Sequence, residues 1–145
     1  MTISGDSPHP LLRVQNLEHS FTVEEETVHA LRGVSFEVKA GEVTAVVGPS
    51  GCGKSTLLNI LGSLDSPTSG NIQLDGQELA NLSEPELATV RNQKIGFIFQ
   101  SHHLLPQCSV LENVLVPTLA EKGKASFDAI ERAKQLLERS GLEHR

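Results

Sequence analysis

The stretch GPSGCGKST, at residues 48–56, constrains this chain more than any other feature of its sequence. It satisfies the spacing G-x-x-x-x-G-K-[ST] of a phosphate-binding loop, a motif that requires a strand before it and a helix after it. Residues 42–47 (EVTAVV) are rich in β-branched residues and nearly all apolar, which is typical of a strand covered on both faces. Residues 54–61 (KSTLLNIL) have the composition of a helix. Because both conditions are met, the stretch is predicted to be a phosphate loop and not an ordinary turn.

The residue types of the loop suit a triphosphate. Backbone N–H groups of a tight loop and the positive end of the following helix can surround an anion, and glycines let the backbone approach it closely. Lys54 is predicted to contact the β- and γ-phosphates, Ser55 to bind Mg²⁺, and Thr56 to bond an α-phosphate oxygen. The residues expected to bind the nucleotide are Gly48, Ser50, Gly51, Cys52, Gly53, Lys54, Ser55 and Thr56.

The chain has two cysteines, Cys52 and Cys108, and both are interpreted as free thiols. A disulfide at Cys52 would tether the phosphate loop. We interpret Cys52 as a tolerated position in the loop without a catalytic role.

The remaining pattern predicts a small β-rich start followed by strands that alternate with helices. Strand patterns occur at residues 11–21, 34–38, 71–74 and 95–99 (IGFIF), and an acidic run at 24–26 is expected to be an exposed turn. Helices are expected at 84–91, after Ser109, and from Ser126 to Gly141, each with a capping residue at its start. This order is typical of an α/β domain with a parallel sheet.

Length and charge restrict the function further. At 145 residues the chain has the size of about one domain, and its net charge of −6 gives no reason to expect a nucleic-acid surface. No apolar run reaches the ~18 residues of a membrane-spanning helix, and the polar N-terminus does not resemble a secretory signal.

Two long stretches resemble one family. LRGVSFEVKAGEVTAVVGPSGCGKSTLLNILGSLDSPTSGNIQLDGQEL (31–79) is similar to the N-terminal part of ABC-transporter ATPase subunits, and RNQKIGFIFQSHHLLPQCSVLENV (91–114) to their Q-loop region. The motifs RNQKIGFIFQSHHLLP, LENV and GLEHR most resemble the ATPase subunits of lipoprotein-releasing systems, with macrolide-exporter ATPases as the alternative. The N-K-x-D motif of a GTPase is absent. The resemblance implies a P-loop NTPase (RecA-like) core with an N-terminal antiparallel β subdomain and the start of a helical subdomain.

The resemblance also implies roles for two residues outside the loop. Phe21 lies where the family places an aromatic side chain that stacks on adenine, and the alternative is a half-buried strand residue. Gln100 matches the Q-loop glutamine, which would contact Mg²⁺ and the attacking water and would act with Lys54 in catalysis. Residues 101–111 would form a groove for a cytoplasmic helix of a membrane subunit.

The family's further machinery is not found in these residues. A Walker B strand, an LSGGQ-like signature and a switch histidine are all missing, so residues 1–145 are expected to be the N-terminal part of one nucleotide-binding domain, truncated and inactive alone. The parent protein would bind ATP and Mg²⁺, pair with a second copy, contact transmembrane permease subunits and lie at the cytoplasmic face of the inner membrane. The alternatives are a non-hydrolytic nucleotide-binding module, if the chain ends at residue 145, and a soluble P-loop ATPase.

Overall fold

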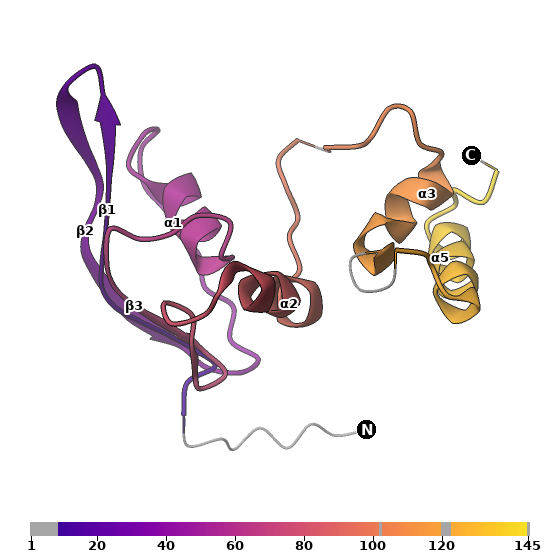
Figure 1. Cartoon of the computed structure of the whole chain (residues 1–145), viewed down its shortest axis with the longest axis horizontal. Helices are drawn as coiled ribbons and strands as arrows, with labels where there is room; N and C mark the ends of the chain where they lie inside the picture. Colours follow the sequence, from indigo (N-terminus) through magenta and orange to yellow (C-terminus); the bar gives the residue numbers. More distant parts are fainter. Residues whose placement is uncertain (1–8, 102, 120–122, 145) are drawn as a thin grey trace. The chain divides into compact units, whose positions relative to one another are not determined.

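A computed structural model describes residues 9–101, 103–119 and 123–144. The chain divides into two compact units, Met1–Ile95 and Gly96–Arg145, which are described separately (Figure 1). In the described part, no helix combines the length and the apolar character that crossing a bilayer requires.

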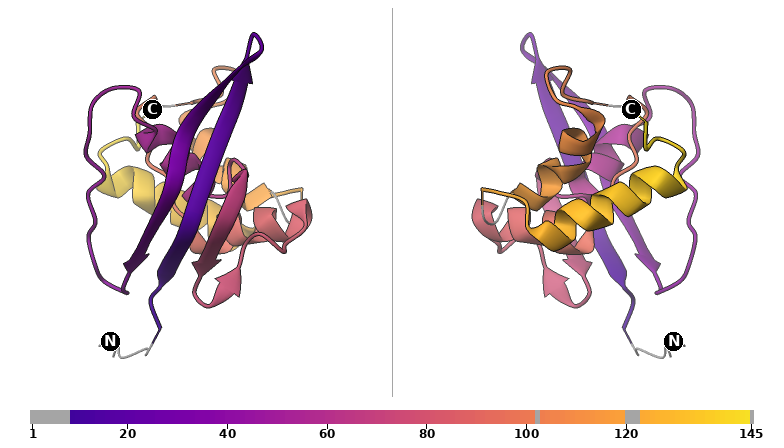
Figure 2. Two further views of the ribbon diagram at one scale, coloured as in Figure 1. Left: turned by 90° about the vertical axis from the view of Figure 1, so that its left-hand side faces the viewer. Right: turned by 90° about the vertical axis from the view of Figure 1, so that its right-hand side faces the viewer.

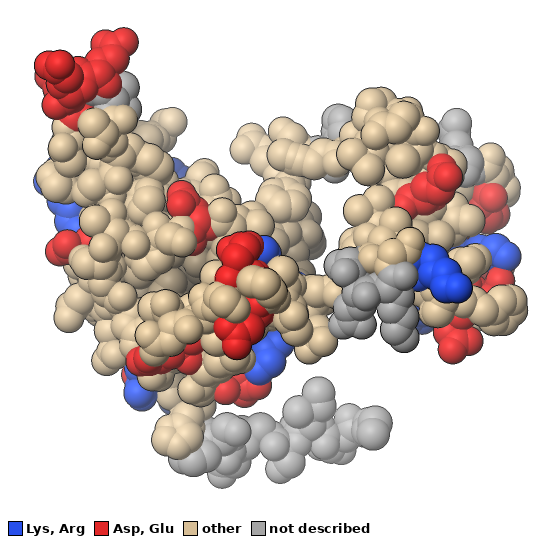
Figure 3. Space-filling view, viewed as in Figure 1, with Lys and Arg blue, Asp and Glu red and all other residues tan. Residues whose placement is uncertain are grey.

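The first unit is built on an antiparallel sheet with the strand order β2-β1-β3-β4. Its strands are β1 (Leu12–Val23), β2 (Glu26–Val38), β3 (Ser69–Leu74) and β4 (Gln77–Glu78). The β1–β2 turn has positive φ angles at Glu24 and Glu25, 50° and 80°, as tight hairpins require. The acidic residues of this turn are exposed, and Figure 3 shows them at the hairpin tip. The antiparallel start predicted from the sequence is confirmed, although β2 is longer than the predicted strand 34–38.

Helices α1 (Lys54–Leu61) and α2 (Glu84–Lys94) lie on one face of this sheet (Figures 1 and 2). Together they bury a core that consists of Val14, Leu17, Leu31, Leu57, Ile60, Ile72, Leu79 and Val90. The predicted cap of α2 is present, because the Ser83 N–H donates to the Glu86 carboxylate at 2.7 Å. Hydrogen bonds from the Ser83 side chain and backbone lower the pKa of Glu86. The cap therefore stabilises α2 at neutral pH, and this stabilisation is lost as the pH falls through the lowered pKa.

Two segments predicted to be buried strands are not strands in the structure. Residues 42–47 and 95–99 form no strand pairs. Val43 and Val47 are 96% and 85% exposed, and Ile98 is 101% exposed. Composition predicted burial for these segments, but a strand also needs a neighbour to accept its backbone hydrogen bonds. The described sheet supplies no such neighbour.

The second unit contains α3 (Val110–Leu115), the 3₁₀ turn η1 (Val116–Thr118) and α5 (Phe127–Arg139). The Ser109 N–H donates to the Glu112 carboxylate at 2.7 Å, so the predicted cap of α3 is confirmed. Gly141 follows α5 with a φ of 67°, as a C-terminal glycine cap requires. Leu115, Ala133 and Leu137 are buried, whereas Phe127, the first residue of α5, is 76% exposed.

Gly70 allows β3 to pack closely against β1, and its replacement tests this contact. Its φ is 95°, and a Cβ there would collide with the Asn16 carbonyl and lie 2.6 Å from the Leu17 Cα. Gly70→Ala is therefore expected to lower the free energy of unfolding by about 4 kcal/mol, from backbone strain and overpacking together.

Gly76→Ala is the matched control, because its φ is 76° but nothing lies within 4 Å of a Cβ there. Strain alone should cost about 1 kcal/mol. Urea unfolding of the complete gene product measures both variants. Equal destabilisation of the two would contradict the packing at Gly70.

Candidate nucleotide site

The loop at residues 48–53 has a backbone that depends on its glycines. The φ angles of Gly48, Gly51 and Gly53 are 153°, 78° and 91°, all in a region that side chains with a Cβ rarely adopt. Gly53 is the N-cap of α1, which begins at Lys54, as the sequence predicts. The loop therefore places successive backbone groups at the positive end of a helix.

The loop also packs directly against β2. A Cβ on Gly53 would lie 2.5 Å from the Ala30 carbonyl oxygen and 3.2 Å from the Leu31 Cδ2. A Cβ on Gly48 would lie 2.7 Å from the Cys52 Sγ. Because these neighbours include backbone, they cannot move aside cheaply. The glycines are thus needed for two reasons: the loop backbone requires their φ angles, and side chains at Gly48 and Gly53 would collide with neighbouring atoms.

The Lys54 side chain folds back over the loop. Its Nζ donates to the Gly48 carbonyl at 3.0 Å and to the Pro49 carbonyl at 2.6 Å. The same Nζ lies 3.7 Å from the Cys52 Sγ. The loop therefore holds one positive charge above its own carbonyl groups. Ser55 is exposed and Thr56 is half-buried, next to Lys54 in the first turn of α1.

A cavity of about 410 Å³ lies between this loop and β2. It is lined by His29, Ala30, Leu31, Arg32, Val34, Gly51 and Cys52. Phe21, the predicted base-stacking residue, is 41% exposed on β1. It pairs with Val28 across the hairpin, next to His29. The structure therefore brings the loop residues together. The pair of Phe21 and Val28 is the next pair along the hairpin from Ser20 and His29, and His29 lines the cavity.

Gln100 belongs to the second unit and is exposed. Its predicted role beside Lys54 and Ser55 therefore remains a prediction. The residues that follow Gln100 contribute to an apolar groove of about 460 Å³. The groove is lined by Leu104, Leu105, Pro106, Cys108, Val110, Asn113, Val114, Leu137 and Leu142. The family resemblance predicts a groove formed by residues 101–111, but residues of α3 and of the C-terminal segment also line the groove. The apolar stripe of α5 and the glycine turn at Gly141 are the sequence features from which the place of Leu137 and Leu142 in the groove could have been predicted.

The exposure of Cys52 leads to a labelling prediction. Cys52 is exposed inside the loop, whereas Cys108 is half-buried. A maleimide is expected to label Cys52 rapidly, and bound Mg-nucleotide is expected to slow that reaction several-fold by covering the loop. Peptide mass spectrometry measures the rate at each site, and Cys108 serves as the internal reference. Equal rates at Cys52 with and without nucleotide would contradict the prediction.

Comparison with known proteins identifies the family. Residues 31–145 match the family model described as ABC transporter. The chain is 52% identical over 135 residues to the lipoprotein-releasing system ATP-binding protein LolD 1 of Rhodopirellula baltica, covering 93% of this chain and 58% of that protein. It is 49% identical to the LolD protein of Shewanella frigidimarina, covering 93% of this chain and 56% of that protein. The chain thus spans less than two thirds of the length of these curated relatives.

Solved structures agree with the sequence comparison. An ATP-binding cassette solved as a dimer in a post-hydrolysis state, bound to ADP and Pi, superposes with a TM-score of 0.80 at 37% identity, covering 90% of this chain and 57% of that one. A structure of a bacterial ABC transporter cassette gives a TM-score of 0.78 at 40% identity, covering 88% of this chain and 54% of that one. The phosphate loop, the antiparallel sheet before it and these matches lead to one conclusion: the chain belongs to the ABC transporter family and is part of its ATP-binding cassette.

Proposed function

We propose that the protein that carries this chain is the ATP-binding subunit of an ABC transporter, and that ATP hydrolysis drives lipoproteins from the inner membrane toward the outer membrane. Residues 1–145 would form the N-terminal part of one nucleotide-binding domain. The main support for ATP binding is the glycine-dependent loop at the start of α1, over which the Lys54 side chain folds. The likeness to LolD proteins at about half identity supports the choice of substrate.

In this proposal the loop residues hold the phosphates. Lys54 would exchange the Gly48 and Pro49 carbonyls for phosphate oxygens, which are stronger acceptors because they are charged. The backbone N–H groups of Gly51 and Gly53 and the side chain of Thr56 would bind the remaining oxygens. Phe21 would stack on adenine, and its 41% exposure leaves part of the ring open to a base.

Ser55 and Gln100 would hold Mg²⁺, which neutralises charge on the phosphates when it is bound. The Ser55 hydroxyl fits this role because it is exposed in the first turn of α1, directly after Lys54. Hydroxyl and amide oxygens are ligands that this hard cation accepts. Gln100 would in addition orient the attacking water. A second copy of the subunit would complete the site, in keeping with the dimeric cassettes that the chain resembles.

The groove of the second unit is the proposed contact with the membrane subunit. Its lining is almost entirely apolar, and Leu104 is 60% exposed. An apolar groove of this kind suits the apolar face of an amphipathic helix. Gln100 lies shortly before Leu104, the first residue that lines the groove, so movement of the bound helix would act on the glutamine. The protein would accordingly lie at the cytoplasmic face of the inner membrane as a peripheral subunit.

One pair of variants tests the groove. Leu105 and Leu119 are both 39% exposed, but only Leu105 lines the groove. Leu105→Asp should abolish co-purification of the complete gene product with its detergent-solubilised membrane subunits, because a carboxylate in an apolar contact is costly. Leu119→Asp is the control. Equal recovery of the complex with both variants would overturn the groove as the contact.

The substrate requires a separate test. The complete complex is reconstituted into proteoliposomes that contain a fluorescent acylated protein, and ATP is added. Release of the acylated protein into solution, absent with Lys54→Met, is the expected result. ATP hydrolysis without any such release would remove the lipoprotein assignment and leave the ATPase proposal standing.

A further inference from the structure

His19 is a buried polar side chain that the roles proposed so far leave unexplained. It is 7% exposed and, among the residues that the structure describes, it is the only polar residue in the buried class. Within this described part, neither ring nitrogen has a hydrogen-bond partner. Buried polar atoms in proteins are nearly always bonded, since leaving one without a partner is costly. A histidine kept in this position therefore calls for a reason other than simple packing.

The imidazole of His19 lies between a carboxylate and an aromatic ring. Its Nε2 lies 3.7 Å from the Asp65 Oδ2. Its ring centroid lies 4.4 Å from that of Phe21, and the two ring planes cross at 79°. This edge-to-face arrangement is the favoured geometry for aromatic pairs. Asp65, His19 and Phe21 thus form a continuous row of contacting side chains.

The backbone around His19 favours this row. The register of β1 against β2 shifts on both sides of His19. Such irregularities re-aim side chains and are common beside functional sites. The neighbouring half-buried Ser20 instead has its hydroxyl 2.8 Å from the Nδ1 of His29 on β2, within hydrogen-bond distance. The hairpin therefore directs its two histidines to different partners, and His19 alone contacts Phe21.

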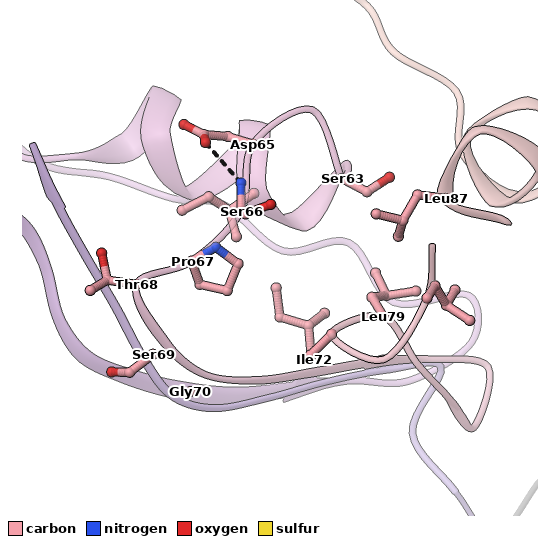
Figure 4. Close-up of a pocket in the computed structure, with 13 residues that line it drawn as sticks. Ser63, Asp65, Ser66, Pro67, Thr68, Ser69, Gly70, Ile72, Leu79 and Leu87 are labelled. Carbon is pink, nitrogen blue, oxygen red and sulfur yellow. Dashed lines mark hydrogen bonds between the residues drawn. The ribbon is translucent and has the colours of Figure 1, made fainter. Parts of the chain in front are cut away.

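Asp65 is held in place by the loop that follows α1. Its Oδ1 accepts the Ser66 N–H at 2.8 Å, a bond that Figure 4 shows. The same loop is fixed to β1, because the Thr68 N–H donates to the Glu18 carbonyl at 2.9 Å and the Ser20 N–H donates to the Thr68 hydroxyl at 3.1 Å. The far end of α1 is therefore joined to the strand that carries Phe21.

We propose that His19 is a positioning residue for the nucleotide base: it braces the Phe21 ring for stacking, and Asp65 holds the imidazole. This inference rests on the proposed ATP-binding function and deepens it. The ring of Phe21 is 41% exposed, so without a brace it would turn between rotamers. Helix α1 begins at the phosphate loop, and Asp65 lies just beyond its other end. The same helix therefore connects the residues proposed to bind the phosphates with the residues proposed to position the base.

The test compares two ligands that differ in the base. Calorimetry on the complete gene product measures the affinity for MgATP and for magnesium tripolyphosphate, which lacks base and ribose. His19→Ala is expected to weaken MgATP binding about two- to tenfold, which corresponds to the loss of one aromatic pair. Tripolyphosphate binding should not change. His19→Phe keeps a ring against Phe21 and should restore most of the ATP affinity.

Coupling between the two residues gives a second readout. In a Phe21→Ala background, His19→Ala should have no further effect on ATP binding, because the ring that it braces is gone. Should His19→Ala fail to fold, Asp65→Asn takes its place. The Asp65 side chain is 42% exposed, and an asparagine can still accept the Ser66 N–H. This variant should weaken ATP binding about twofold and leave tripolyphosphate binding unchanged.

Four results would overturn the inference. Equal losses for ATP and tripolyphosphate would mean that His19 supports the fold in general. Unchanged ATP binding in both His19→Ala and Asp65→Asn would mean that Phe21 needs no brace. A wild-type protein that binds neither ligand would remove the proposed nucleotide function itself, whereas tripolyphosphate binding without a preference for ATP would remove only the roles of Phe21 and His19.

Discussion

Lys54→Met is expected to reduce ATP hydrolysis by the complete gene product about 100- to 1,000-fold. The Lys54 Nζ is held over the loop by two carbonyl oxygens, at 3.0 and 2.6 Å, and among the described residues no other lysine or arginine donates to them. Methionine keeps the length and the apolar stem of lysine but removes the charge that would stabilise the phosphates during transfer. Phosphate release at saturating MgATP measures the effect.

Lys39→Met is the matched control, since Lys39 is an exposed lysine at the end of β2 and outside the loop. It should retain wild-type turnover. Lys54→Arg is a second informative variant, because a planar guanidinium does not reproduce the compact charge of an ammonium group. We expect it to stay well below wild type. Turnover above about a tenth of wild type in Lys54→Met would contradict the assignment of Lys54.

A polypeptide of these 145 residues, prepared by itself, is expected to aggregate and to unfold without a sharp transition. Residues 42–47 and 95–99 lack strand partners, and Val43, Val47 and Ile98 are each at least 85% exposed. Unpaired apolar strand segments are templates for association between chains. Because the motifs for hydrolysis are not found in these residues, its ATP turnover should be close to zero. Sedimentation, calorimetry and dye binding to apolar surface measure these properties.

Substitutions in the two exposed segments test whether their apolar side chains cause the aggregation, or whether the polypeptide is unstable in general. Changing Val43, Val47 and Ile98 to threonine keeps the β-branched shape and adds polarity, so the soluble fraction should rise. Threonine at Leu57 and Ile60, which are buried in α1, should instead lower it. A sharp, reversible melt of monomeric wild-type polypeptide would contradict the expectation of partial folding.

Local features of the fold could be predicted from the sequence. Helix α1 has the predicted bounds, because the loop motif sets its start and Gly62 its end. The caps at Ser83 and Ser109 were also predictable, since each depends on a serine and a glutamate three residues apart. Strand β2 was predicted too short, because its first half pairs through the hairpin and carries little apolar alternation.

Features that depend on distant partners could not be predicted in this way. The composition of residues 42–47 and 95–99 indicates a preference for burial, but pairing depends on a neighbouring strand that the described sheet does not supply. The loop residues of the site are contiguous in sequence, so one motif was enough to find them. The contact of His19 with Asp65 joins residues far apart in the chain, and neither residue belongs to a recognisable motif.

The fit of Gly53 against β2 has a consequence for the evolution of such chains. In the proposed function Lys54 acts only on the nucleotide, so a gene copy released from selection for nucleotide use would be free to replace it. Gly53 cannot be replaced as freely, because the Ala30 carbonyl oxygen would lie only 2.5 Å from a Cβ at this position. A duplicated gene that has lost activity but still needs its fold should therefore keep the glycine long after the lysine has drifted. The order in which these two positions change would then date the loss of function relative to the loss of structure.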